Sequence, residues 1–560
     1  MKKSYIIALI FILGLNVSCE KFLQETPPTF ISTSNFYKSE SDARTACDGV
    51  YQKFNDGGSN SMYGRWWPAI DLGTDDATSR ATRTTFNSWF SHTINASEPW
   101  FESWNQYSVF WEGIGRANAV IANVPNINMD VAKRNAIVGE ARALRALYYF
   151  HLVKTYGDVP LITSEIKTID DFSKPRADVD QVYDEIIIPD LKYAEENCKN
   201  TLHDGRVTKW TAKVILADVY LTRAGWMRKS KDGVLVQGDP ANWTLARDKA
   251  KEILDGSPHR LITTPVINGR NTVPACGVAW DTSSPYSVES MMEISAVNEA
   301  GFGSWLSRES AALPTGTSFW GANTARPLSS EGITSTVAQM RFPGNPPGVG
   351  NYIPTPDLFR SFETGDQRRD WAILTRYTDV DGTNYLIQPS FRKYIDIDYY
   401  LGKPNTSFQN TNNNFLLYRF ADALLIFAEA ANEVSPASTG DAAYIAVNRI
   451  RNRAGLPNLT AGLSQSQFRN AVYRERRSEF AGECKRRFDL IRTNRLLEET
   501  ALIEVDWRAS DNPRGGTNYS NRNSLYTGTV VWPEREWLMP IPFSEVQLNK
   551  SNNWYQNFGY

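Results

Sequence analysis

The residues in this chain with the clearest capacity for chemistry are tryptophans outside any helical or strand pattern. An indole ring can stack on the flat C–H face of a sugar, whereas carboxylate, amide and guanidinium groups bind sugar hydroxyls. Among 17 tryptophans, three lie on apolar helix stripes and are predicted to be core residues: Trp104, Trp111 and Trp210. Six others follow no period: Trp66, Trp67, Trp89, Trp280, Trp305 and Trp320. The latter rings are candidates for a sugar-binding platform.

Two interpretations are open for each of these rings. A single tryptophan in a large loop region fills core space at least as often as it binds a ligand, but the rings taken as a set favour a platform. Asp75 and Asp76 lie in the same early irregular segment as Trp66, Trp67 and Trp89. Their carboxylates could bind sugar hydroxyls or could close turns of their own loop, and the sequence supports both interpretations equally.

Recognisable catalytic motifs are absent from the sequence. It has no nucleophile elbow, phosphate-binding loop or dinucleotide fingerprint. Its histidines are scattered without metal-ligand spacing, at His92, His151, His203 and His259. His151 falls on an apolar helix stripe and is predicted to be a hydrogen-bonded core residue. The sequence thus favours a binding protein without metal or cofactor; a glycosidase stays open, because only distances can reveal a catalytic carboxylate pair.

The charge balance argues against a nucleic-acid partner. Lys and Arg number 60 and Asp and Glu number 62, which leaves a net charge of −2 and no electrostatic attraction to phosphates. Basic clusters at 474–477 and 485–487 alternate with Glu475, Glu479 and Glu483. This alternation predicts a solvated helix face that carries salt bridges.

The first 18 residues have the pattern of a secretory signal peptide, in which two lysines precede an apolar run from Tyr5 to Leu15. Ser18 before Cys19 is typical of a bacterial lipoprotein cleavage site. We therefore expect Cys19 to be lipidated and to hold the protein on a membrane surface. The alternative is an ordinary cleavage site beside an incidental cysteine. No other apolar run reaches the length of a transmembrane span.

The remaining cysteines are widely spaced and form no Cys-x-x-Cys pair: Cys47, Cys198, Cys276 and Cys484. This spacing excludes a zinc ribbon or a dithiol redox motif. Most of them fall in helical patterns, where buried free thiols are common. We therefore predict no obligatory disulfide.

Helical hairpins are the elements that must position these residues. Between residues 136 and 156 apolar side chains recur in steps of three and four, while Glu140 and Arg145 lie on the other face. This pattern predicts a helix with one buried face, ended by Gly157. Residues 102–124 are predicted to pack antiparallel to it. Further helices are predicted over 178–197, interrupted near Pro189, over 209–225 with 243–255, and over 415–434 with 441–454. The last one is predicted from Ser464 through Arg492, with a cap formed by Ser464 and Gln467 and a break at Gly482.

These helix pairs resemble tetratricopeptide hairpins and predict a mainly α fold. The stretch 257–410 is rich in Pro, Gly, Ser and Asn and mostly lacks a helical period, which is typical of a functional insertion. One β-hairpin is predicted within this stretch, with its turn at Asp381-Gly382. The same residues do not form a calcium loop of the EF-hand type, because the glycine follows Asp379 too early for that motif. The aromatic segment from Trp537 to the C-terminus is predicted to pack back on the body. We expect a signal peptide at 1–18, then the regions 19–256, 257–410 and 411–560 in one intertwined body.

Several blocks, in their order along the chain, resemble the SusD/RagB family of surface lipoproteins from Bacteroidetes glycan-uptake systems. They include RANAVIANV, GEARALRALYYFHLVKTYGDVPLI, GRVTKWTAKVILADVYL, LYRFADALLIFAEAAN, AVNRIRNRAGLP and ERRSEFAGECKRRFDLIR. The resemblance implies a mostly helical fold with tetratricopeptide-like hairpins and an irregular ligand-binding region. It also implies a TonB-dependent, SusC-like outer-membrane barrel as partner, whose outer mouth this protein closes.

The resemblance further implies where a ligand would bind. Family members hold glycan with aromatic residues of an early loop and of the mid-chain insertion, close to an acidic residue and an arginine. The matching positions are Trp89, Asp75, Asp76 and Arg83 in the early loop, and Trp280, Trp305 and Trp320 in the insertion. The implied function is non-catalytic capture of an oligo- or polysaccharide at the outer membrane, facing the cell exterior. A peptide-binding, RagB-like protein is the alternative, and a surface glycosidase is a less favoured one.

Overall fold

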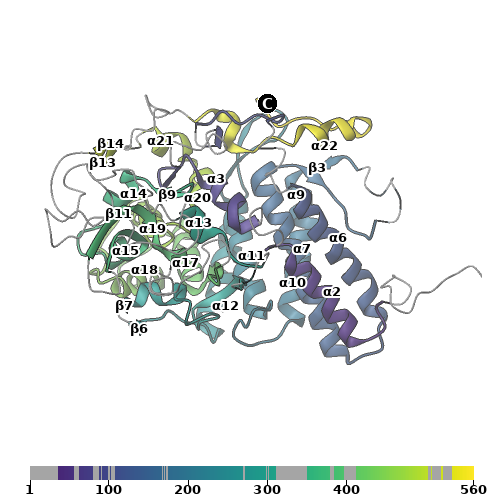
Figure 1. Cartoon of the computed structure of the whole chain (residues 1–560), viewed down its shortest axis with the longest axis horizontal. Helices are drawn as coiled ribbons and strands as arrows, with labels where there is room; N and C mark the ends of the chain where they lie inside the picture. The colour runs from purple at the N-terminus through teal and green to yellow at the C-terminus, as the bar shows by residue number, and fades with distance from the viewer. Residues whose placement is uncertain are drawn as a thin grey trace, which may run out of the picture.

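Long antiparallel helices form one side of the molecule, and shorter helices with two-stranded strand pairs form the other (Figure 1). The structure is a computed structural model. It describes residues 36–55, 62–79, 88–89, 91–98, 101, 107–166, 168, 171, 174–268, 271–297, 299, 302–310, 350–378, 384–395, 411–501, 503, 506–507, 519–520 and 532–560. The prediction of a mainly α fold with minor β-hairpins is confirmed.

Helix α7 (Val131–Tyr156) is the central element of the long-helix side. It begins at Asp130, whose side chain accepts a hydrogen bond from the Lys133 backbone N–H at 2.9 Å, and it ends at Gly157 with φ +73°. The left-handed stop at this glycine confirms the helix end predicted from sequence. From Ile137 to Tyr156, every residue of the helix is buried except Arg142 and Lys154, which are partly buried.

The prediction that α7 buries one face only is therefore wrong. Its polar residues are buried by partners on neighbouring helices. Arg145 donates to Asp190 at 2.7 Å and to Asn118 at 2.6 Å, and Glu140 accepts from Arg44 at 2.6 Å. A sequence period distinguishes apolar from polar faces, but it cannot reveal a polar face that is covered by complementary charges.

The helices around α7 follow the predicted order. Ser39 forms a capping box with Asp42 at the start of α2, and the segment before Pro189 is a π-helical interruption. This interruption separates two α-helices, as the sequence predicted near that proline. The elements are α2 (Glu40–Gln52), α6 (Tyr107–Asn123), α9 (Val179–Val182), η5 (Tyr183–Ile187), α10 (Ile188–Asn197), α11 (Lys209–Ala224) and α12 (Ala241–Gly256).

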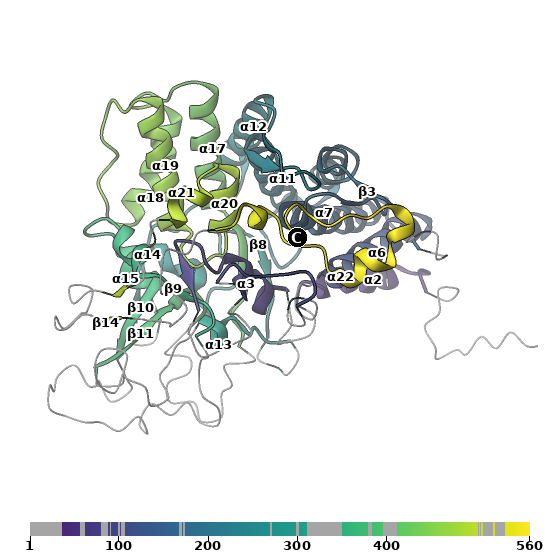
Figure 2. The same cartoon turned by 90° about the horizontal axis from the view of Figure 1, so that it is seen from above.

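A buried antiparallel strand pair lies near the middle of the molecule (Figure 2). Strand β12 (Phe415–Arg419) pairs with β8 (Ser290–Ile294), with Phe415 opposite Ile294, and every residue of both strands is buried. The sequence predicted a helix from 415 onward, and this is wrong for the first five residues, because they form the strand. A short apolar run fits a buried strand as well as a buried helix, and the pairing partner decides between them.

The C-terminal helices follow directly from this strand. Ser464 forms the predicted capping box with Gln467, and the predicted break occurs at Gly482, whose φ is +78°. A left-handed residue ends the helical path there, so the chain turns before the next helix. The elements are α17 (Phe420–Val434), α18 (Ala442–Arg453), α19 (Gln465–Glu479), α20 (Arg486–Arg492) and α21 (Leu496–Thr500).

Short elements complete the described part of the insertion and the connections. The predicted hairpin is confirmed by the pairing of β10 (Ile373–Thr378) with β11 (Asn384–Phe391), whereas its turn lies outside the described residues. Other strand pairs are β1 (Ala77–Thr78) with β9 (Ile353–Pro354), β2 (Val159–Pro160) with β3 (Arg176–Ala177), β4 (Trp226–Arg228) with β5 (Leu235–Gln237), β6 (Val266–Asn268) with β7 (Asn271–Val273), and β13 (Asp506–Trp507) with β14 (Tyr519–Ser520).

The short helices are distributed over the whole chain. They are η3 (Met62–Trp66), α3 (Trp67–Asp71), η4 (Val124–Asn126), η6 (Ala275–Trp280), α13 (Leu306–Ser310), α14 (Pro356–Ser361), α15 (Gln367–Ala372), η8 (Arg392–Tyr394), η10 (Glu534–Trp537), α22 (Phe543–Leu548) and η11 (Lys550–Asn552). The C-terminal segment, yellow in Figures 1 and 2, runs along the long helices. Arg176 donates to the Tyr555 carbonyl at 2.7 Å and to Asn557 at 2.6 Å, which confirms that this segment packs on the body.

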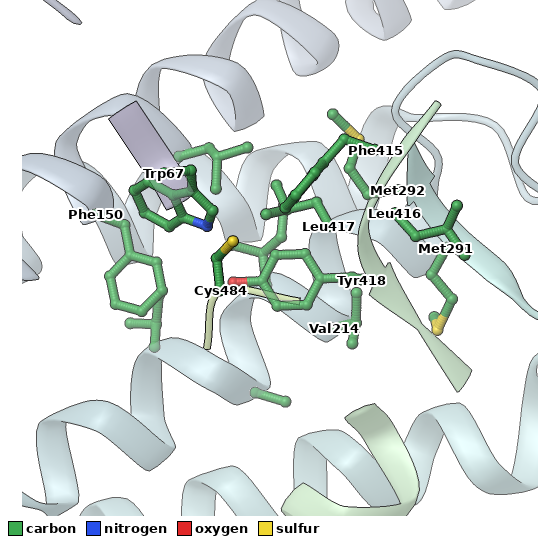
Figure 3. Packing of buried hydrophobic residues seen from close by; sticks show 14 of the residues in the cluster. Trp67, Phe150, Val214, Met291, Met292, Phe415, Leu416, Leu417, Tyr418 and Cys484 are labelled. Atoms are coloured by element: carbon green, nitrogen blue, oxygen red, sulfur yellow. The ribbon is translucent and has the colours of Figure 1, made fainter. Parts of the chain in front are cut away.

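One hydrophobic cluster joins residues from both ends of the chain. In Figure 3, Trp67 of α3, Phe150 of α7 and Val214 of α11 meet side chains of β8, of β12 and of Cys484. The four cysteines within the described residues are free and buried. Over the same residues no helix has both the length and the apolar composition needed to cross a bilayer, and no group of His, Cys, Asp and Glu has metal-site geometry.

The basic clusters at 474–477 and 485–487 are mostly buried, so the predicted solvated face is wrong. Glu479, at the end of α19, pairs with Arg453, with Arg419 at 2.5 Å and with Arg368 at 3.1 Å. Burial alone would raise the pKa of the Glu479 carboxyl, but these arginines hold that pKa well below its ordinary value. The alternating charges in the sequence therefore belong to a buried network of ion pairs.

We predict that Glu479→Gln lowers the free energy of unfolding by about 3–5 kcal/mol, because it leaves several buried guanidinium groups without their shared carboxylate. Glu40→Gln is the control, since Glu40 pairs with Lys133 on the surface, where both side chains are about half accessible. It should cost about 0–1 kcal/mol. Urea unfolding followed by circular dichroism measures both, and equal small losses would contradict a structural role for the buried network.

Candidate functional site

A groove of about 430 Å³ lies where three segments distant in sequence meet. One wall is the C-terminal end of α2, the second is the loop 204–206 before α11, and the third is β8 with its flanking loops. This volume falls in the range typical of small-ligand sites. The lining residues include Asp48, Tyr51, Gln52, Asn55, Asp204, Arg206, Tyr286, Glu293, Val297 and Phe302.

Asn55 holds the end of α2 against the third wall. Its side-chain amide donates hydrogen bonds to the carbonyls of Ser295, at 3.0 Å, and Phe302, at 3.1 Å. Because α2 is itself anchored through buried Ala43, Cys47 and Val50, the loop that carries Phe302 is tied to a rigid helix. The groove is therefore held open by the scaffold.

Tyr51 and Arg206 form the second corner of the groove. The guanidinium carbon of Arg206 lies 5.2 Å from the Tyr51 ring centroid, and the guanidinium pairs with Asp48 and, at 3.6 Å, with Glu140. The Tyr51 hydroxyl donates to Glu140 at 2.9 Å and accepts from the Val207 backbone N–H at 2.7 Å. Burial and the nearby Glu140 raise the pKa of Tyr51 well above its ordinary value, so the phenol stays neutral.

Tyr286 and Glu293 form the third wall with an unusual backbone. Tyr286 adopts a φ of +54°, and its backbone N–H donates to Glu293 at 3.1 Å, while its hydroxyl lies 2.6 Å from that of Ser295. A non-glycine residue in this conformation is strained and is held by its surroundings. Gly205 packs against this ring, since a Cβ on it would lie 3.3 Å from the Tyr286 hydroxyl oxygen.

The rim of the groove exposes apolar surface beside carboxylates. Phe302 is 54% exposed and Val297 is 48% exposed, and the side chains of Asp48 and Asp204 are 51% and 58% accessible. An exposed aromatic ring next to hydrogen-bond acceptors suits a ligand with an apolar face and many hydroxyls. A sugar has both features.

Trp89 and Trp280, which were predicted to form the platform, lie in the core. Trp89 is 2% exposed and packs edge-on against Trp66 at 5.1 Å, and Trp280 is 7% exposed and packs edge-on against Tyr394 at 5.6 Å. In this structure neither ring offers a face to solvent. Their role in binding stays a prediction, and their burial argues for the alternative of core filling.

Asp75 and Asp76 hold arginines of the C-terminal region. Asp75 accepts two hydrogen bonds from Arg486, at 2.8 and 2.6 Å, and Asp76 accepts one from Arg477 at 2.6 Å. Although burial would raise it, these arginines hold the pKa of Asp75 below its ordinary value. The carboxylates thus make long-range ion pairs, which neither interpretation of the sequence had considered.

Of the other predicted site residues, only Trp305 lies within the described part of the chain. Trp305 is half-buried just before α13, with the Arg308 guanidinium carbon 4.7 Å from its ring centroid. Arg83, Trp320 and Cys19 lie outside the described residues. Of the predicted residues that are described, Trp305 lies nearest in sequence to a groove residue, three positions after Phe302.

The structure confirms the prediction that His151 is a core histidine. It is fully buried, and its Nε2 lies 3.0 Å from the Tyr63 hydroxyl. Burial, followed by the charge of Lys154, lowers its pKa well below the ordinary value, so the imidazole is neutral. It has no part in the groove.

Burial raises the pKa of several described carboxyls, as a glycosidase acid needs, but each is already engaged. They are Asp71, Asp76, Asp190, Glu293, Asp422 and Glu475. Burial raises the pKa of Asp71 to about 7, and this carboxyl accepts hydrogen bonds from the Tyr352 hydroxyl at 2.9 Å and from the Arg487 backbone N–H at 3.1 Å. Burial also raises the pKa of Glu293, which accepts from Asn414 at 2.6 Å. The other four carboxyls are likewise held by cations of the fold: Asp76 by Arg477, Asp190 by Arg145, Asp422 by Lys485 and Glu475 by Arg368.

Sequence reasoning missed most of the groove residues. Tyr51 and Asn55 lie where the helical period of α2 gives way to an irregular segment, and Tyr286 and Phe302 lie in the insertion. The change of composition at both places was a usable signal. Arg206 had no signal of its own, because its partners Asp48 and Glu140 are distant in sequence.

Two family models match separate parts of the chain. A model described as the SusD family matches residues 360–560, and one described as "Starch-binding associating with outer membrane" matches residues 37–221. Among curated relatives, SusD-like protein P25 of Formosa agariphila is 27% identical over 572 residues, covering 98% of this chain and 97% of the relative. SusD-like protein P2 of the same organism is 27% identical and covers 100% of both chains.

Solved structures show the same fold. A SusD superfamily protein from Parabacteroides distasonis superposes with a TM-score of 0.71 at 24% identity, covering 93% of this chain and 100% of that one. A laminarin-binding SusD-like protein superposes with a TM-score of 0.66 at 24% identity, covering 94% and 100%. The family models and the curated relatives confirm the resemblance seen in the sequence blocks, and the solved structures confirm the fold.

We predict that Trp89→Ala lowers the free energy of unfolding by about 3–5 kcal/mol, because it empties a buried site. Trp305→Ala should cost less stability, since the Trp305 side chain is only partly buried. Thermal melts and titration calorimetry with a bound glycan separate stability from affinity. A Trp89→Ala protein that melts like the wild type and binds glycan at least tenfold more weakly would restore Trp89 to the platform.

Proposed function

We propose that this chain, which matches the SusD family model over residues 360–560 and a starch-binding model over 37–221, is a non-catalytic glycan-binding lipoprotein of the cell surface. It captures an oligo- or polysaccharide and delivers it to a TonB-dependent, SusC-like outer-membrane barrel. The observation that carries this proposal is the match of residues 37–221 to a starch-binding family model. These residues include the first two walls of the groove.

The groove supports this proposal through its chemistry. Phe302 offers an exposed ring, and Asp48 and Asp204 offer accessible carboxylates at the same rim. Sugar hydroxyls donate well to carboxylates, and the C–H face of a pyranose covers an aromatic ring. A solved protein of this fold is a laminarin-binding SusD-like protein, which makes a glucan a sensible first ligand to test.

Anchoring and partnership belong to the same proposal. Cys19 is the lipidation site, and a lipid on this residue places the protein on the outer membrane, facing the cell exterior. The family model that covers 37–221 is described as associating with the outer membrane. The broad helical side of the molecule is the surface offered to the barrel, and the irregular regions are left for the cargo.

We predict that Phe302→Ala weakens glycan binding by about 1–3 kcal/mol, or roughly tenfold to a hundredfold, because it removes a stacking surface. The melting temperature should hardly change, since the ring is 54% exposed. Phe543→Ala is the matched control, because Phe543 is 49% exposed on α22, away from the groove. Titration against a panel of purified polysaccharides and a peptide mixture measures the effect.

Binding of peptides alone would replace glycan with peptide as cargo. Release of sugar products from a bound glycan, lost when a carboxylate is changed, would make the protein a glycosidase. If Phe302→Ala and Phe543→Ala lost the same affinity for glycan, the groove would not be the glycan-binding site.

We predict that Cys19→Ala abolishes incorporation of labelled fatty acid and releases the protein from the membrane fraction, because the anchor is attached to that thiol. The wild-type protein, extracted in mild detergent, should co-purify with an outer-membrane barrel. Anchoring at Cys19 would be contradicted if the Cys19→Ala protein stayed in the membrane fraction and the wild-type protein incorporated no labelled fatty acid. Purification of the wild type without any barrel would contradict the partnership.

A further inference from the structure

A second cavity, a cleft of about 1240 Å³ along helix α19, shares no lining residue with the groove. Its lining comes from α19, from the loop 457–463 after α18, and from α20 and α21 with the loop 493–495 between them. The cleft is larger than a typical small-ligand pocket, and most of its lining side chains are polar or charged. It therefore has the room and the polarity for an extended hydrophilic ligand.

The charges of this cleft are largely compensated. Arg474 and Glu498, both exposed, carry opposite charges. Three other arginines of the lining are each paired with a carboxylate at 2.6 Å: Arg451 with Glu363, Arg477 with Asp76 and Arg486 with Asp75. Because most of its charges are paired, hydrogen-bonding capacity decides which ligand fits the cleft.

Two buried polar atoms of the lining lack a hydrogen-bond partner within the described residues. They are the Tyr473 hydroxyl and Nη1 of Arg486, in residues that are 7% and 5% exposed. The two groups are neighbours, since the Arg486 guanidinium carbon lies 4.5 Å from the Tyr473 ring centroid. Burial raises the pKa of Tyr473 above its ordinary value, so its hydroxyl keeps its proton. Buried donors without a partner cost stability, and a ligand oxygen would satisfy both.

Trp226 supplies an aromatic surface to the same cleft. It is partly buried, and it packs against the hydrophobic cluster that contains Tyr473. Asn458 and Asn494 are exposed lining residues of the loops after α18 and before α21. A side-chain amide both donates and accepts hydrogen bonds, as a sugar hydroxyl does, and an indole ring suits the C–H face of a sugar. These groups together fit a saccharide chain.

We propose that this cleft is a second glycan-binding site, separate from the groove, in which Trp226 stacks on a sugar ring while Tyr473 and Arg486 bind sugar hydroxyls. The inference goes beyond the proposed function and takes from it the class of ligand, a glycan. A long polysaccharide that reaches both sites is held more tightly than by either site alone, because the second contact becomes intramolecular once the first has formed.

The test locates the binding sites on the full-length protein. Wild-type protein and variants are titrated by calorimetry with short oligosaccharides of the glycans that it binds, those of laminarin being tried first. We expect an oligosaccharide at each site of the wild type, and Phe302→Ala should keep the one at the cleft. Trp226→Ala should weaken binding at the cleft at least about tenfold.

Tyr473→Phe is the sharper variant, because it removes only a hydroxyl that has no partner in the described part of the fold. It should weaken binding at the cleft several-fold to about tenfold without lowering the melting temperature. It decides the outcome if Trp226→Ala does not fold. The matched controls are Trp243→Ala, since Trp243 is also partly buried, and Tyr560→Phe, since that hydroxyl is also buried without a described partner. Neither residue lines the cleft.

The inference would be overturned if Tyr473→Phe bound every oligosaccharide as the wild type and Tyr560→Phe do, while Phe302→Ala lost all binding. Glycan binding at the groove would then still stand. Binding of peptides at the cleft in place of glycans would also overturn the inference. Loss of binding in Tyr473→Phe, with Phe302→Ala unaffected, would support the cleft and remove the groove. If no glycan bound the wild-type protein, the proposed function would be wrong, and the inference with it.

Discussion

Buried ion pairs around Glu479 join parts of the chain that are far apart in sequence. Arg419 ends strand β12, Arg453 ends α18 and Glu289 lies just before β8, and their charged groups meet at Glu479 or at one another. Charges in an interior are stable only when each has a partner in good geometry. The network therefore demands one relative placement of the C-terminal helices and the central strand pair, and the rest of the structure is built around that placement.

The groove depends on this placement through β8. That strand is held by its pairing with β12, and it carries Glu293 and leads into the loop that holds Phe302. The opposite walls come from α2 and from the loop before α11, which are set by their packing on α7 and on the strand pair. A site built between rigid elements keeps its shape without a ligand, so the exposed ring of Phe302 is in place before a ligand binds.

Much of the candidate site could not be predicted, for reasons that differ between residues. Trp89 and Asp75 have types suited to sugar binding, yet Trp89 packs against Trp66 and Asp75 pairs with Arg486, a residue 411 positions away. Residue type states what a side chain can do, whereas burial and partner decide what it does. The reverse holds for Asn55, an ordinary loop residue in sequence that proves to tie one wall of the groove to another.

The sequence by itself determined most of the long helices and several of their ends, because caps, left-handed glycines and apolar periods are local properties of the chain. The helix end at Gly157, the cap at Ser464 and the break at Gly482 could all be predicted. Only the tertiary structure decided that Phe415 to Arg419 form a strand, that the alternating charges of α19 are interior, and that Arg206, Tyr51 and Phe302 share one groove. These outcomes depend on partners that lie outside the local segment, from 26 residues away for Arg453 and Glu479 to 247 for Asn55 and Phe302. The local sequence does not specify which distant segment will pack against it.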